Sequence, residues 1–149
     1  FEAFLPSDKK ERAVILEELK QETRTIILYE APHRLVKTLE ELQESLGDRK
    51  ISLCRELTKK HETVFRGSLL EAFSWYKENP PKGECVMVLA GRSREEIEQE
   101  ARQKWEDMPL EEHMEYYMSQ GIDKKEAMKL VAKDRGISKR DVYQALLKN

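Results

Sequence analysis

Two polar clusters follow apolar runs in this chain, and both contain residue types used in acid–base chemistry and in anion binding. The first is Tyr29-Glu30-Ala31-Pro32-His33-Arg34, and the second is Arg55-Glu56-Leu57-Thr58-Lys59-Lys60-His61-Glu62. Carboxylates and imidazoles accept protons in general base catalysis, whereas arginine and lysine bind phosphates and carboxylates. Open α/β sheets place ligand sites at the carboxyl ends of their strands, so both clusters are candidates for a functional site.

The first cluster has a structural explanation as well as a functional one. Pro32 suits the first turn of a helix, and His33 and Arg34 are expected in that turn, where the helix dipole disfavours cations. A phosphate or carboxylate bound at this helix end would reverse the effect. Pairing of Arg34 with Glu30 or with a neighbouring acid would explain the same residues without a ligand, and the sequence leaves both alternatives open.

The second cluster has seven polar or charged residues out of eight, and a solvated loop is the usual explanation for such a run. Arg55 and Glu56 are adjacent at the end of a strand, so their side chains point to opposite faces. At least one of the two is therefore expected to face a packed layer. Lys59, Lys60 and His61 have the charge needed to hold a phosphate backbone.

Composition restricts the classes of protein to which the chain can belong. It has 149 residues, 38% of them charged and 39% hydrophobic, with a net charge of −2. Such values are typical of a globular protein and give no strong field toward nucleic acid or an anionic membrane. No apolar run is long enough to span a bilayer, and we expect a cytoplasmic protein. Cys54 and Cys85 are expected to be buried thiols, and no metal site is expected.

Strands and helices alternate in residues 1–91, which predicts a layered α/β domain with a mixed sheet flanked by helices. Helices are expected at about 8–22 and 32–46 and from residue 68, and strands at 25–29, 50–56, 63–67 and 84–89. The strand at 25–29 is almost continuously apolar, so we expect both of its faces to be covered. Ala90 and Gly91 follow the last strand and would either let a ligand approach the backbone closely or form an ordinary turn.

The rest of the chain is expected to be helical. Residues 92–109 form a charged connector, and residues 110–149 form a small all-α appendix with helices at about 110–120, 123–135 and 138–148. Asp123 and Ser138 are expected as helix caps, and Gly121 and Gly136 as helix ends. The glycine turn before the last helix matches a helix-turn-helix pattern, although a helical bundle that packs on the protein itself is the alternative.

Several motifs occur in an order and at a spacing that resemble a known family. They are Phe4-Leu5-Pro6, Arg24-Thr25, the two polar clusters and Arg66-Gly67. Over essentially the whole chain they resemble the bacterial ribosomal RNA small subunit methyltransferase I family, ribose 2′-O-methyltransferases of the tetrapyrrole methylase superfamily. The resemblance implies the C-terminal α/β domain of that fold plus the helical appendix, without the N-terminal domain. The family usually has glycine where this chain has Ala3, at a position where a positive φ or a close cofactor approach would favour glycine.

The resemblance also implies a reaction and a set of site residues. S-adenosylmethionine would be the cofactor, a cytidine of 16S small-subunit ribosomal RNA the substrate, and the complete protein, rather than this fragment, the active enzyme. By similarity, the cofactor would contact Tyr29, Glu30, Arg55, Leu57, Thr58, Ala90 and Gly91. The RNA-facing residues would be His33, Arg34, Lys59, Lys60, Lys139 and Arg140. The candidates for accepting the hydroxyl proton or for orienting a base are Glu56, Glu62, His61 and Glu30.

The expected partners are small-subunit ribosomal RNA or its particle, the N-terminal domain that this sequence lacks, and a second copy in a homodimer, with no membrane. Two other functions remain open. In the first, the helical tail binds nucleic acid through Lys139, Arg140, Tyr143 and Gln144, and the α/β part is an inert platform. In the second, the protein methylates a tetrapyrrole, whose carboxylates would also suit the basic residues.

Overall fold

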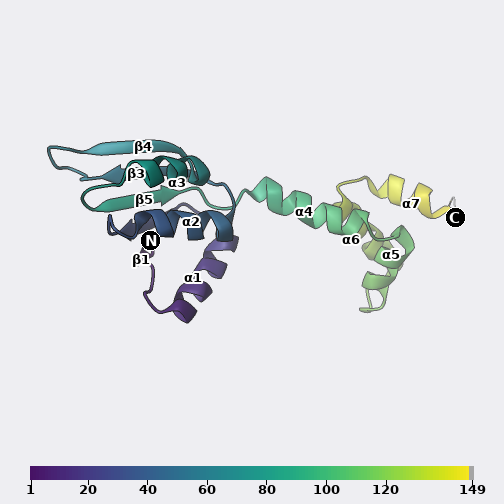
Figure 1. Cartoon of the computed structure of the whole chain (residues 1–149). Coiled ribbons are helices and arrows are strands. Elements are labelled where there is room, and N and C mark those ends of the chain that lie inside the picture. The colour runs from purple at the N-terminus through teal and green to yellow at the C-terminus, as the bar shows by residue number, and fades with distance from the viewer. Residues whose placement is uncertain (148–149) are drawn as a thin grey trace. The chain divides into compact units, whose positions relative to one another are not determined.

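The computed structural model describes residues 1–147 and divides into two compact units, Phe1–Ser93 and a second unit that begins at Arg94 (Figure 1). The first unit is α/β and the second is all helical, which confirms the predicted fold class. Residue 148, the expected end of the last helix, lies outside the described residues. No helix in the described part of the chain is long and apolar enough to cross a membrane.

The α/β unit contains one mixed sheet of five strands. These strands are β1 (Ala3–Phe4), β2 (Ile26–Glu30), β3 (Lys50–Arg55), β4 (Thr63–Ser68) and β5 (Cys85–Leu89). Their order across the sheet is β1-β2-β5-β3-β4, with β1 parallel to β2 and every other neighbouring pair antiparallel. Because β5 lies between β2 and β3 and runs against both, its carboxyl end lies at the opposite end of the sheet from theirs.

Three helices cover one face of this sheet: α1 (Lys9–Gln21), α2 (Leu35–Leu46) and α3 (Leu69–Glu78). Right-handed crossovers explain why they share a face. The β1-to-β2 and β2-to-β3 connections step the same way between strands of the same direction, whereas the β4-to-β5 connection reverses both the step and the strand direction. Leu28, Leu53 and Met87 are fully buried beneath the helices, one from each of the three inner strands.

The expectation that β2 is covered on both faces is wrong for this chain. Every second residue of β2 faces the helices, but Tyr29 points to the other face and is 38% exposed. The rings of Phe1 and Phe4 lie edge-on to the Tyr29 ring, with centroids 5.2 and 5.7 Å away. The continuous apolar run therefore reflects one buried face and one exposed aromatic cluster.

Local sequence signals set most helix ends. Asp8 caps α1, and Ser68 forms a capping box with Glu71 at the start of α3. Gly47 ends α2 with a φ of 79°, which glycine adopts without strain. The start of α2 differs from the prediction: the helix begins at Leu35, and Arg34 is the N-cap residue rather than part of the first turn. Its side chain makes no capping bond, because it is turned toward Glu30 instead.

The helical unit contains α4 (Arg94–Glu106), α5 (Leu110–Met118), α6 (Lys124–Arg135) and α7 (Lys139–Leu147). Asp123 accepts from two backbone N–H groups at the start of α6, and Gly136 ends that helix in the left-handed conformation, so both predicted boundaries are confirmed. Much of the segment expected as a connector is helix α4, which packs on α6. The assignment of 1–91 and 110–149 as functional domains stays a prediction.

The helical unit contains a stacked aromatic and polar cluster in addition to its apolar core. The fully buried His113 ring stacks on Trp105 with centroids 4.0 Å apart. His113 Nδ1 accepts from Arg135 Nε at 3.1 Å, and Nε2 lies 3.2 Å from Asp134 Oδ2, so a neutral ring protonated on Nε2 satisfies both contacts. Burial lowers the pKa of His113, and together with a hydrogen bond to Asp134 it raises the pKa of Tyr117 to about 12.

Candidate functional site at the ends of β2 and β3

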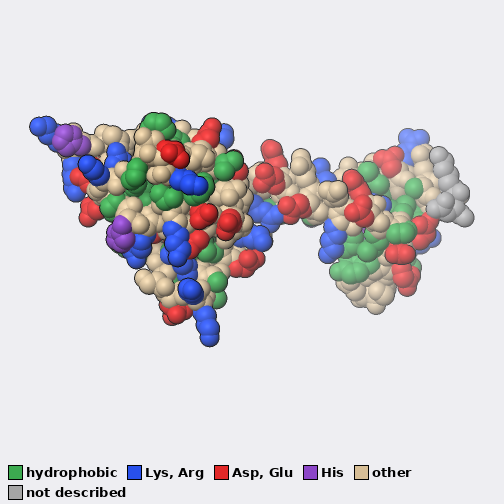
Figure 2. Space-filling model, viewed as in Figure 1, with side chains coloured by type: hydrophobic (Ala, Val, Ile, Leu, Met, Phe, Trp, Pro, Cys, Tyr) green, Lys and Arg blue, Asp and Glu red, His purple; other side chains and the backbone are tan. Residues whose placement is uncertain are grey.

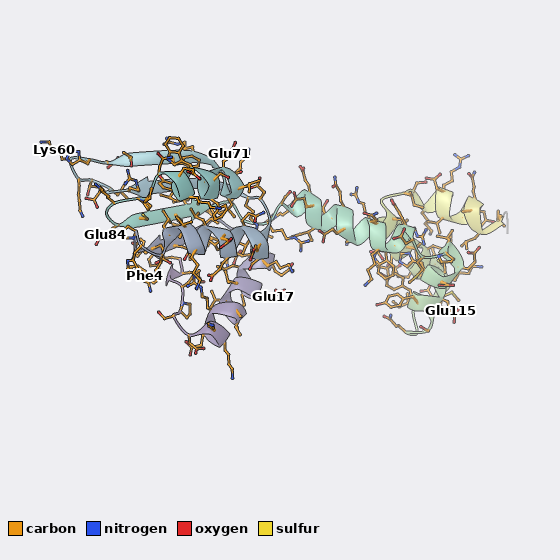
Figure 3. All side chains as sticks on the ribbon, in the orientation of Figure 1. Phe4, Glu17, Lys60, Glu71, Glu84 and Glu115 are labelled. Carbon is orange, nitrogen blue, oxygen red and sulfur yellow. The ribbon has the colours of Figure 1, made fainter. Side chains whose placement is uncertain are left out.

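The structure brings the two polar clusters to the same end of the sheet. Glu30 and Arg55, the last residues of β2 and β3, are both paired in register with Cys85, the first residue of β5. Leu89 at the other end of β5 is paired with Ile26 and Ile51 instead. Figure 3 shows this separation, with Lys60 and Glu84 at one end of the sheet and Glu71 toward the other.

Glu30 is buried and bonded on both carboxylate oxygens. Oε1 accepts from the Ala31 N–H at 2.8 Å and from Arg34 Nε at 3.1 Å, while Oε2 accepts from the Thr38 hydroxyl at 2.7 Å. Thr38 in turn accepts from Arg12 Nη2 at 2.9 Å, which ties α1 to α2. Of the two alternatives for Arg34, the structure shows the pairing with Glu30.

His33 and Arg34 remain accessible at the surface even so. His33 is exposed, and 45% of the Arg34 side chain is exposed although its Nε is bonded to Glu30. Both side chains lie just before α2 on the carboxyl side of β2. A role in RNA binding is compatible with these positions and stays a prediction.

Arg55 is the member of the Arg55–Glu56 pair that lies next to a packed layer. Its Nη1 donates to the Lys82 carbonyl at 2.9 Å, and its buried Nε has no hydrogen-bond partner among the described residues. The guanidinium lies close enough to Cys85 and Tyr76 to oppose the effect of burial on both groups. Burial nevertheless dominates and raises the pKa of the Cys85 thiol to about 11.

The loop after β3 is strained and bonded to itself. Glu56 and Thr58 have φ values of 49° and 66°, a region that side-chain-bearing residues rarely occupy. The Lys59 N–H donates to the Glu56 carbonyl at 2.9 Å, and the Thr58 N–H donates to the Glu62 carboxylate at 2.6 Å. Strained backbone of this kind persists where surrounding contacts fix it, and it is concentrated at functional sites.

Glu56 contacts the segment just before β5, which lies far from it in the sequence. Its Oε1 accepts from the Glu84 N–H at 3.1 Å, and its Oε2 lies 3.6 Å from Lys59 Nζ. Lys59 Nζ also lies 3.5 Å from Glu84, and the charges of the two carboxylates raise the Lys59 pKa. The antiparallel pairing of β3 with β5 places Gly83 and Glu84 beside Glu56, and this pairing is the signal that could have identified the contact.

The remaining residues of the second cluster point to solvent. Leu57 is 46% exposed, and Lys60 and His61 are exposed in the loop between β3 and β4. Figure 2 shows basic and histidine side chains together at the tip of this loop. No group of three or more His, Cys, Asp or Glu side chains in the described residues is placed to hold a metal ion.

Ala90 and Gly91 are not brought together with the other expected cofactor residues, because β5 ends at the opposite end of the sheet. A Cβ on Gly91 would lie 2.2 Å from the Thr23 carbonyl carbon, so the chain's own backbone makes the close approach that glycine permits. Ala90 is exposed and lines a hollow of about 620 Å³ together with Lys50 and Arg66. Cofactor binding by these two residues stays a prediction.

In the helical unit, α6, Gly136 and α7 form a helix, a turn and a second helix. Lys139 is partly exposed and Arg140 is exposed at the start of α7, and Tyr143 on the same helix is 54% exposed. The arrangement agrees with a helix-turn-helix pattern, but contact with nucleic acid stays a prediction.

Comparison with known proteins identifies the family of the α/β unit. Residues 2–72 match the family model described as Tetrapyrrole (Corrin/Porphyrin) Methylases. The α/β unit belongs to the tetrapyrrole methylase family. This match covers Phe4 and Tyr29 of the exposed aromatic cluster, the Glu30 contacts and the strained loop.

Curated relatives of the chain match its helical unit as well as its α/β unit. A Bacillus subtilis protein named ribosomal RNA small subunit methyltransferase I is 47% identical over 97% of the chain and 49% of its own length. Proteins of the same name from Synechocystis and Pasteurella multocida are 40% and 34% identical, over 99% and 97% of the chain and 51% and 50% of their own lengths. The chain thus spans about half the length of the curated relatives it matches.

Proposed function

We propose that this chain is the C-terminal half of a methyltransferase that modifies small-subunit ribosomal RNA. The observation that supports this most strongly is the similarity, over 97% of the chain, to a protein whose name states that activity. The finer assignment, transfer from S-adenosylmethionine to the 2′-oxygen of a cytidine, rests on the resemblance of the two polar clusters and the motifs around them. A missing N-terminal half would complete the cofactor cleft, and a homodimer is the expected assembly.

The residues at the carboxyl ends of β2 and β3 suit a ligand that has both a planar ring and polar groups. Tyr29 and Leu57 expose apolar surface there, Thr58 exposes a hydroxyl, and the Arg55 guanidinium supplies positive charge at the end of β3. Bound S-adenosylmethionine would supply a methyl group activated by its sulfonium sulfur. The residues of this chain would orient that ligand and the RNA.

Glu56 is the carboxylate in this chain best placed to accept or direct the hydroxyl proton. Its side chain is 26% exposed at the strand end, so a substrate can reach it. Glu30 is buried under three hydrogen bonds, and the Glu62 carboxylate is bonded to the backbone of its own loop. A positioned general base contributes roughly 10²- to 10⁴-fold to a rate.

The RNA would contact basic side chains that remain accessible to solvent in the folded protein. Lys60, His33 and the outer part of Arg34 are accessible in the α/β unit, and Lys139 and Arg140 are accessible in the helical unit. Phosphate contacts of this kind make binding depend on salt concentration, with a log–log slope of about −0.7 per phosphate neutralised on a single strand.

The test uses the full-length protein that carries this sequence, labelled S-adenosylmethionine and small-subunit ribosomal particles, with ribose and base products resolved. Label on a ribose 2′-oxygen is expected. Arg55→Ala and Glu56→Ala should each reduce transfer, whereas wild-type activity in both would refute the assignment of the site. Transfer to a base nitrogen or carbon would refute the 2′-oxygen assignment while retaining a methyltransferase.

The helical unit supports a second candidate, a nucleic-acid-binding module. The observation that favours it is the accessible start of α7 next to the left-handed turn at Gly136. If the full-length protein retains RNA or DNA but transfers no methyl group, and if Arg140→Ala weakens that retention, this second function replaces the first.

A further inference from the structure

The Glu56 side chain is held by two groups, one from each of two loops. The Glu84 N–H donates to Oε1 at 3.1 Å, and the Lys59 ammonium lies 3.6 Å from Oε2. The backbone of Glu56 is bonded to the same segment, because its N–H donates to the Glu84 carbonyl at 3.2 Å. Each carboxylate oxygen therefore has its own partner, which fixes where the carboxylate points.

Gly83 provides the space that this arrangement needs. A Cβ on Gly83 would lie 1.8 Å from Glu56 Oε1 and 2.4 Å from Glu56 Cδ, so the carboxylate occupies the position of a missing side chain. The φ of Gly83 is +79°, which also favours glycine. An alanine at this position would force the Glu56 carboxylate away without altering Glu56 itself.

Lys59 is poorly placed to serve mainly as an RNA contact. Its ammonium lies between two carboxylates, 3.6 Å from Glu56 and 3.5 Å from Glu84. Its charge is therefore balanced by two carboxylates at the surface, whereas the neighbouring Lys60 is exposed at the loop tip without an ion pair among the described residues. Two adjacent lysines that look equivalent in the sequence thus have different surroundings.

From this geometry we propose that Lys59 and Gly83 are positioning residues that hold the Glu56 carboxylate for the reaction, a role that rests on the proposed function. Lys59 attracts the Glu56 carboxylate by its positive charge, and Gly83 leaves the space that this carboxylate occupies. Neither residue needs to touch the substrate. Misplacement of a reacting group by about 1 Å can lower a rate by about a hundredfold, so a small displacement of Glu56 is expected to be measurable.

The first test compares Gly83→Ala with Gly47→Ala in the full-length protein. Both glycines have a φ of +79°, but an alanine at position 47 would meet nothing within 4 Å. Both variants therefore share the backbone strain, and only Gly83→Ala displaces Glu56. We expect kcat for methyl transfer to fall at least about tenfold in Gly83→Ala and to stay near wild type in Gly47→Ala. Equal kcat values in the two variants would overturn the role of Gly83.

The second test separates positioning from RNA binding. Lys59→Met should lower kcat with little change in the KM for RNA, Lys59→Arg should restore most of kcat, and Lys60→Met should chiefly raise KM. Lys10→Met, on the exposed start of α1, is the control for loss of a positive charge. If Lys59→Met raises KM and leaves kcat unchanged, Lys59 is an RNA contact and the proposal is wrong.

A readout that needs no activity distinguishes failure of this proposal from failure of the proposed function. The titration of the Lys59 ammonium can be followed by NMR in the wild type and in Glu56→Gln. Because the Glu56 charge raises the Lys59 pKa, that pKa should fall in the variant. An unchanged Lys59 titration would show that Lys59 and Glu56 are not in contact, and the proposal would be wrong. A lowered Lys59 pKa in a protein that transfers no methyl group would support the contact but refute both the proposed function and the positioning role.

Discussion

The two ends of the sheet carry similar sequence signals but have different structures. At the carboxyl ends of β2 and β3, charged residues form a strained loop and a set of paired carboxylates with accessible side chains around them. At the carboxyl end of β5, Gly91 packs directly on the Thr23 backbone, and the Arg92 N–H donates to the Glu22 carbonyl at 2.6 Å. One end leaves charged side chains accessible, and at the other the chain packs on its own backbone.

The direction of β5 explains the difference. Polar or small residues after an apolar strand predict a ligand site only if that strand ends on the same side as its neighbours, as in a parallel sheet. β5 runs antiparallel to both β2 and β3, so the residues before it, Gly83 and Glu84, reach the site, and those after it do not. Four predictions test this division.

The largest effect is expected at the packing end. Gly91→Ala should destabilise the α/β unit by about 3 kcal/mol, since the new Cβ would lie 2.2 Å from backbone atoms that cannot move easily. Gly47→Ala, with free space around it, should lose only about 1 kcal/mol from its positive φ. Urea unfolding measures both. If the two variants lose equal stability, the close approach at Gly91 is not what that position requires.

A smaller loss of stability is expected at Glu30, the buried carboxylate at the end of β2. Glu30→Gln should destabilise the protein by about 2 kcal/mol, because the amide replaces a buried carboxylate that accepts three hydrogen bonds. Glu44→Gln, on the exposed side of α2, is the matched control and should be near neutral. Unchanged stability in Glu30→Gln would show that Glu30 is not a structural support.

A gain of stability is expected at the start of β1. Ala3 has a φ of 52°, so Ala3→Gly should relieve strain and stabilise the protein by about 1 kcal/mol, less the added chain entropy of glycine. Thermal unfolding of the two proteins under identical conditions measures the difference. A lower melting temperature for the glycine variant would contradict a left-handed conformation at this position.

The smallest effect concerns pH. Burial raises the pKa of Cys85 from 9.0 to about 11, so the unfolded thiol ionises before the folded one does. Stability from this group is therefore complete below pH 9 and is lost as pH rises toward 11. The urea midpoint should decrease between pH 8 and pH 10, and this decrease should be larger in the wild type than in Cys85→Ala. The same fall in both proteins would show that another group causes it.

The sequence predicted local features better than the arrangement of strands. The order of strands and helices, Gly47 as the end of α2 and the Asp123 cap follow from patterns within a few residues, and all were found. The glycine that the family prefers at position 3 also pointed correctly to a positive φ at Ala3.

The candidate site was only half predictable for a physical reason. Register between distant strands decides which residues meet, and no local pattern states that β5 lies between β2 and β3. The contacts of Glu56 with Gly83 and Glu84 were missed for this reason, as was the close approach of Gly91 to the Thr23 backbone. The pairing of Arg34 with Glu30, which lie four positions apart, was expected as one alternative.

The most direct test of the account is the rate of methyl transfer by two matched variants of the full-length protein. Glu56→Gln changes a carboxylate at the site end, and Glu71→Gln changes one toward the other end, where glutamine can still complete the capping box with Ser68. We predict a loss of about a hundredfold for Glu56→Gln and less than about twofold for Glu71→Gln. Wild-type rates in Glu56→Gln, or equal losses in both, would contradict the division of the sheet into a reactive end and a packing end.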